Sequence, residues 1–144
     1  MTHFWNSWTM CWCGTLGLFG IILAGGALPA TDGLAQLYFH LMNHPEEIDF
    51  TPHLRVSLAV LGGVCVGWSM TLFATFQAAN ALSGTAAIPT WRLLSAGLVS
   101  WYVLDSVLSI ATGFWLNAVV NTIFFVALLS PIVSAGVLRD RTQH

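Results

Sequence analysis

Apolar residues in this chain are gathered into four long stretches, which short polar segments separate. A helix needs about 20 predominantly apolar residues to cross a bilayer. Four stretches reach this length, and we expect membrane-spanning helices over about 8–28, 53–82, 90–111 and 115–138. The residues "TGFW" leave room only for a tight turn between the last two helices, which predicts an antiparallel hairpin. The pattern predicts an all-α integral membrane protein, with four transmembrane helices in one antiparallel bundle and a single domain over 1–144.

The segment 30–52, between the first two spans, is the only sizeable extramembrane part of this pattern. It begins with a helix N-cap signal at Thr31 or Asp32. Apolar side chains then follow at helical spacing, at Leu34, Leu37, Tyr38 and Leu41. This spacing predicts a short amphipathic helix that lies in the membrane interface between the first and second spans.

Composition supports the membrane class. Charged residues make up 7% of the chain, against about 25% in soluble domains, and 56% of the residues are apolar. So few charges would not cover the surface of a soluble domain, so we expect the lipid bilayer to be a partner. The chain has no Lys, no basic run and a formal net charge of −2, which argues against nucleic acid as a partner.

The four arginines predict an orientation. Arg92, Arg139 and Arg141 fall on the same side of the membrane as the N-terminus, and Arg55 falls on the other side. The excess of arginine on one side indicates that both termini face the cytoplasm. The compact four-span plan is typical of bacterial proteins, so we expect a bacterial cytoplasmic (inner) membrane. No Lys or Arg precedes the first stretch, which favours a retained helix over a signal peptide.

Small residues and tryptophans suggest how the spans pack. The second span carries small residues every four positions, and the first span carries matching ones at Gly14, Gly17, Gly20 and Ala24. Such a stripe lets two helix backbones approach closely in lipid. We expect it to pack the first two spans together, with docking of a partner chain as the alternative. Its members are Ala59, Gly63, Gly67, Thr71, Thr75 and Ala79, and the first four are the predicted helix-packing residues. Five tryptophans near the span ends fit interfacial anchors, namely Trp5, Trp8, Trp12, Trp91 and Trp115.

Polar side chains gather in the predicted hairpin. Asp105 lies about seven residues before the turn and Asn121 about seven after it, so both sit about 10 Å below the membrane surface. Ser109 lies one turn from Asp105, and Asn117 one turn from Asn121, so the four residues can form one ladder. The ladder can simply fix helix register, at about 0.6 kcal/mol per hydrogen bond. An ionisable residue inside a membrane is also a functional hypothesis by default.

On the functional interpretation, Asp105 is a candidate catalytic acid or base, or a hydrogen-bond anchor, beside a groove. Asn117, Asn121 and Ser109 would orient a ligand there. Arg55, Tyr38 and Trp101 are further candidates for the walls, and Arg55 is the one candidate counter-ion for Asp105.

His40 and His44 share one face of the predicted interfacial helix, because they are four residues apart. Such a pair can ligate a metal or a porphyrin-type pigment. A solvent-exposed face of a helix that ends at Pro45 explains the same pattern. We favour that interpretation and predict no metal site.

Two functions fit these observations. The first is a non-catalytic accessory or interaction subunit of a larger membrane assembly, respiratory or photosynthetic, with other membrane protein subunits as partners. Lipid or quinone would reach the groove beside Asp105 in that case. The alternative is a small membrane enzyme or carrier for an apolar molecule. No cofactor is firmly implied, although a bound lipid, quinone or pigment is compatible with the groove.

Overall fold

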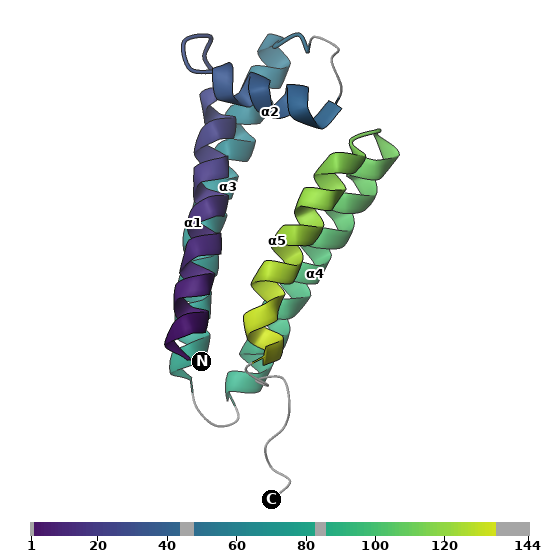
Figure 1. Cartoon of the computed structure of the whole chain (residues 1–144). Helices are drawn as coiled ribbons and strands as arrows, with labels where there is room; N and C mark the ends of the chain where they lie inside the picture. Colours follow the sequence, from purple (N-terminus) through teal and green to yellow (C-terminus); the bar gives the residue numbers. More distant parts are fainter. Residues whose placement is uncertain (1, 44–47, 83–85, 135–144) are drawn as a thin grey trace, which may run out of the picture. The chain divides into compact units, whose positions relative to one another are not determined.

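The computed structural model describes residues 2–43, 48–82 and 86–134. Within these ranges the chain is all-helical, with five helices and no strand. The helices are α1 (His3–Gly25), α2 (Gly33–Asn43), α3 (Pro52–Ala81), α4 (Ala87–Ala111) and α5 (Trp115–Ser134) (Figure 1). Four of them, α1, α3, α4 and α5, are long enough and apolar enough to cross a membrane, as the sequence pattern predicts.

The helix bounds differ from the predicted spans mainly at the N-terminus. α1 begins at His3, ahead of the predicted start near Trp8, and it ends at Gly25. The extra residues include Phe4 and Trp5, whose rings pack against each other and against Trp8. Residues 135–138 of the predicted fourth span, together with Arg139 and Arg141, lie outside the described residues.

Local chemistry explains where helices begin. Thr51 caps α3, because its hydroxyl oxygen accepts the backbone N–H of Leu54 at 3.3 Å. Pro52 then occupies the first helical position, where its missing N–H is not needed. Asp32 directly precedes α2 and its carbonyl accepts the N–H of Gln36 at 2.8 Å, which confirms the predicted N-terminus.

The turn between α4 and α5 is a Schellman motif. The N–H of Phe114 bonds to the carbonyl of Ser109 at 2.8 Å, and the N–H of Gly113 bonds to that of Ile110 at 3.1 Å. Gly113 has a φ of +89°, a conformation that costs glycine little and other residues more. The predicted tight turn and antiparallel hairpin are confirmed at this point, and α4 and α5 lie side by side (Figure 1).

The chain divides into two compact units. Unit 2 comprises Cys13–Leu72, and unit 1 comprises Met1–Trp12 with Phe73–His144. α1 and α3 each contribute to both units. That all of 1–144 forms one domain stays a prediction.

In unit 2, α1 and α3 run antiparallel and their backbones come into close contact. A Cβ added to Gly62 would lie 2.7 Å from the Cβ of Ala24, and one added to Gly20 would lie 2.8 Å from the carbonyl oxygen of Gly62. Real Cβ atoms are essentially never so close to a neighbour, so glycine is required at both positions. The hydroxyl of Ser69 adds a hydrogen bond across the pair, to the carbonyl oxygen of Cys13 at 2.8 Å.

The face of α3 that meets α1 is not the predicted stripe. Gly63 and Gly67 are exposed, and a Cβ on either would meet no atom of the described residues within 4 Å. Thr71 is also exposed, and Ala59 is half-buried. On α1, Gly17 and Gly20 lie at the contact as predicted, whereas Gly14 faces open space. The residues of α3 that meet α1 are instead Gly62, Cys65 and Ser69, and Leu58 meets Gly26 just beyond the end of α1. This face combines small side chains, which allow close approach of the backbones, with the hydrogen bond of Ser69 across the pair.

Unit 1 is packed by larger side chains. Trp91 is 2% exposed and its ring meets that of Phe76 edge-on, with centroids 5.8 Å apart. Trp91 is therefore a core residue, and the expectation that it anchors a membrane interface is wrong. Leu98, Leu128 and Ile132 are buried in the same unit.

Pro131 creates a tertiary contact in unit 1. A proline inside a helix cannot donate to the carbonyl four residues earlier, which is that of Ala127. The indole N–H of Trp8 donates to this carbonyl at 2.8 Å. The backbone acceptor that Pro131 leaves unpaired in α5 thus holds the N-terminal part of α1, while the role of Trp8 as an interfacial anchor stays a prediction.

Candidate functional sites

The first candidate site is the hairpin cluster, formed by Asp105 and Ser109 of α4 and Asn117 of α5. The amide of Asn117 donates to Asp105 Oδ1 at 3.1 Å and to Ser109 Oγ at 2.8 Å. The hydroxyl of Ser109 donates to the same Asp105 oxygen at 3.2 Å. The structure therefore brings three of the four predicted ladder residues together, with the carboxylate as the shared acceptor.

The fourth residue, Asn121, lies outside these hydrogen bonds. Its side chain is 6% exposed, and its Nδ2 atom has no hydrogen-bond partner among the described residues. Ser106 Oγ, on α4, is buried in the same unpartnered state. A buried donor without a partner costs about 1–3 kcal/mol, so a polar group from outside the described residues that reached either atom would stabilise the fold.

The other predicted wall residues lie apart along the chain. Trp101 is half-buried on α4, in the same unit as the hairpin cluster. Tyr38 is in unit 2, where its ring packs edge-on against Phe19 at 5.1 Å. Arg55 is also in unit 2 and pairs there with Asp32, so the expectation that it serves as counter-ion to Asp105 is replaced by this observed pair.

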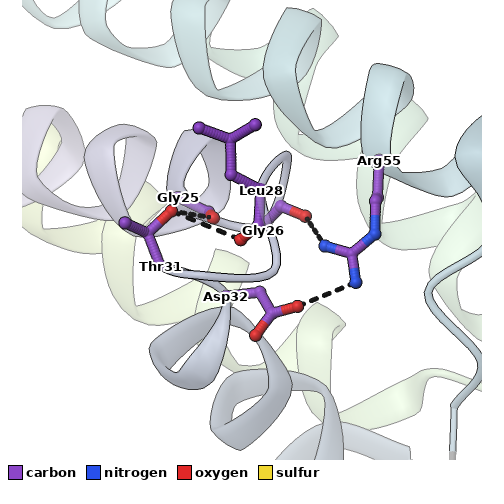
Figure 2. A network of polar contacts seen from close by, with 6 residues as sticks. All are labelled: Gly25, Gly26, Leu28, Thr31, Asp32 and Arg55. Carbon is purple, nitrogen blue, oxygen red and sulfur yellow. Dashed lines mark hydrogen bonds and ion pairs between the residues drawn. The ribbon is translucent and has the colours of Figure 1, made fainter.

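The second candidate site is the junction network around Arg55, at the start of α3 (Figure 2). One guanidinium nitrogen lies 2.9 Å from Asp32 Oδ2, and the other donates to the carbonyl oxygen of Gly26 at 3.1 Å. The hydroxyl of Thr31 donates to the carbonyl of Gly25 at 2.7 Å. Carbonyls at the C-terminal end of a helix lack partners within the helix, so these donors satisfy the end of α1. Arg55 thereby ties together the end of α1 and the starts of α2 and α3.

Comparison of the sequence with family models, with curated proteins and with solved structures finds no match.

A cavity of about 750 Å³ lies beside the junction network, between α2, the segment that precedes α3, and α3 itself. This volume is within the range of small-molecule sites. It is lined by Gly33, Gln36, Leu37, His40, Ile48, Asp49, Phe50 and Arg55. The guanidinium of Arg55 lies 5.3 Å from the centre of the Phe50 ring, a cation–π contact that helps to fix both side chains at the wall.

Of the two weak metal candidates, His40 lines this cavity and His44 lies outside the described residues. In the described part of the chain no group of three His, Cys, Asp or Glu side chains is placed to hold a metal ion.

Sequence reasoning missed the junction network and the cavity. From the sequence, Asp32 is expected only as a helix cap, and no role is expected for Gly26. A usable signal was present, because Asp32 and Arg55 flank the only long polar segment at opposite ends. An anion near one end of such a segment and a cation near the other end can pair when the two neighbouring helices pack together.

Proposed function

We propose that this chain is a non-catalytic accessory subunit of a larger membrane protein assembly. In this proposal α1, α3, α4 and α5 cross a bacterial cytoplasmic membrane as one antiparallel bundle, with both termini in the cytoplasm. The assembly would be a respiratory or photosynthetic one, and a lipid or quinone would lie beside Asp105.

The observation that carries the proposal is the open pair of glycines on α3, Gly63 and Gly67. Gly63 and Gly67 are four residues apart, exposed and open to a close neighbour, while the contact with α1 uses a different face. In lipid, two glycines at this spacing permit a second helix to approach backbone to backbone. A helix of a partner subunit is the occupant that this geometry favours.

Native mass spectrometry of the protein, gently extracted from its own membrane, tests the proposal. We expect a mass well above that of one chain, with defined partner proteins. The double variant Gly63→Leu/Gly67→Leu should lose the partners, because the larger side chains hold the backbones apart. Gly97→Leu is the matched control. Gly97 is an exposed glycine of α4 with open space, but its neighbours at four residues are Leu93 and Trp101. A chain that is extracted alone would contradict the proposal.

A second function is favoured by the hairpin cluster together with the buried, unpartnered amide of Asn121. In this alternative the protein is a membrane enzyme or carrier for a small apolar molecule, with Asp105 as acid, base or hydrogen-bond anchor. Asp105→Asn keeps the shape of the side chain and removes the ionisable group. Loss of ligand retention or turnover at unchanged stability would support this function, whereas an unchanged protein would exclude it.

A further inference from the structure

The cavity in unit 2 has an unusual balance of charge. Arg55 and Asp32 neutralise each other at 2.9 Å, so the pair adds no net charge to the wall. Asp49 is exposed and also lines the cavity. Within the described ranges the single ion pair is that of Arg55 with Asp32, so the Asp49 carboxylate brings one uncompensated negative charge.

The same wall is rich in hydrogen-bond donors. Arg55 keeps donor capacity beyond its bonds to Asp32 and Gly26, because a guanidinium carries five N–H groups. Gln36 supplies an amide, and His40 supplies an imidazole one turn later on α2. The cavity thus offers donors for an anionic group and, at Asp49, an acceptor for a cationic group.

One edge of the cavity continues onto an apolar surface. Leu37 lines the cavity and is 52% exposed, and it lies on one face of α2 with Leu34 and Leu41, which are 60% and 62% exposed. These three leucines are part of the predicted amphipathic pattern. In the described structure Ala35, not this face, is the fully buried residue of α2. An apolar face of this kind suits the boundary between lipid headgroups and acyl chains.

We propose that this cavity binds the headgroup of a zwitterionic phospholipid. The phosphate accepts hydrogen bonds from Arg55, Gln36 and His40, the ammonium group lies against the Asp49 carboxylate, and an acyl chain follows the exposed leucines of α2. A purely anionic headgroup is disfavoured, because its charge would lie near the Asp49 carboxylate and the one arginine of the wall is already paired with Asp32. The inference rests on the membrane insertion that is part of the proposed function, but it does not require a partner subunit.

The experiment uses the purified, delipidated full chain in detergent, titrated with dioctanoyl phosphatidylethanolamine or with dioctanoyl phosphatidylglycerol, and retained lipid is counted by native mass spectrometry. We expect about tenfold tighter retention of the zwitterionic lipid, the difference that one charge-assisted contact contributes. Asp49→Asn should remove this preference. Both lipids should bind more weakly to His40→Ala, while His53→Ala, an exposed histidine that does not line the cavity, should behave as the unchanged protein.

Each alternative outcome overturns part of the inference. Equal retention of the two lipids, or an Asp49→Asn variant with the original preference, would exclude the zwitterionic headgroup. Binding of free phosphoethanolamine as tightly as of the lipid would show a headgroup ligand without a membrane source. Asp49 and His40 are exposed, so both variants should fold, which circular dichroism checks. Carbonate extraction of membranes separates failure of membrane insertion from failure of the lipid site.

Discussion

Different kinds of contact stabilise the interior of each of the two units. Unit 2 relies on contact between the backbones of α1 and α3 at Gly20 and Gly62, and on the charged junction network of Arg55 and Asp32. Unit 1 relies on large side chains such as Trp91, and on neutral donors that surround the carboxylate of Asp105.

The difference shows how position limits the chemistry that a long apolar helix tolerates. The junction network lies at helix ends, where unpaired carbonyls are available and an arginine can reach them. The hairpin cluster lies within two helices, where its carboxylate is paired with an amide and a hydroxyl. A substitution should therefore lower the stability strongly where it leaves a charge unpaired. It should lower the stability only slightly where it removes one neutral hydrogen bond.

The largest effect is expected for Arg55→Ala. This variant leaves Asp32, which is 6% exposed, without its cation and leaves the Gly26 carbonyl without its donor. Breaking a buried pair by removing one partner costs about 3–5 kcal/mol, and we expect about 3 kcal/mol here because the Arg55 side chain is 22% exposed. Unfolding in detergent by heat or by SDS measures the loss.

The double variant Arg55→Ala/Asp32→Ala is the control for this prediction. It removes the stranded carboxylate, so much of the stability should return. If Arg55→Ala alone unfolds as easily as the double variant, the charge left on Asp32 is not the cause.

The next effect separates the two faces of α3. A Cβ on Gly62 would lie 2.7 Å from the Cβ of Ala24, whereas a Cβ on Gly63 would meet nothing within 4 Å among the described residues. Gly62→Ala should destabilise unit 2 by about 2 kcal/mol through overpacking. Gly63→Ala should leave the isolated chain as stable or more stable by about 0.5–1 kcal/mol, because alanine is the better helix former. Thermal unfolding of the two variants side by side would show the reverse order if the predicted stripe were the true contact face.

The third effect concerns the carbonyl that Pro131 frees in unit 1. Trp8→Phe removes the indole donor from Ala127 and should cost about 1 kcal/mol, beyond the small loss of ring area. In a Pro131→Ala background, the new backbone N–H can bond to Ala127, so Trp8→Phe should cost less. A double-mutant cycle measures this coupling, and strictly additive effects would show that the two residues act separately.

The parts of this architecture that depend on local signals could be predicted from the sequence. The apolar stretches and the turn at Gly113 are local signals, so the long helices and the hairpin were predicted. The residues of the hairpin cluster lie only 12 positions apart across one tight turn, so counting from the turn was enough to bring Asp105 and Asn117 together.

Contacts between distant segments were harder to predict. Each residue along a helix is rotated by about 100° from the one before it. The predicted contact at Gly63 and the observed contact at Gly62 therefore lie on different faces of α3, although they are one residue apart. The hydrogen bond from Trp8 to Ala127 spans 119 positions. It also depends on Pro131, which leaves the Ala127 carbonyl without a helical donor. The spacing of Asp32 and Arg55 carries no helical or strand period, so periodicity gave no sign of their pairing.

The smallest effect is expected in the hairpin cluster. Asn117→Ala removes the amide that bonds to both Asp105 and Ser109. The bond from Ser109 to Asp105 remains, so the carboxylate keeps one donor. Hydrogen bonds between membrane helices contribute about 0.6 kcal/mol on average, and we expect a loss of about that size or slightly more. Val119→Ala, at an exposed position of the same helix, controls for a general effect of truncation. A loss above about 2 kcal/mol would mean that the carboxylate depends on Asn117 as strongly as Asp32 depends on Arg55, and the contrast between the two units would then disappear.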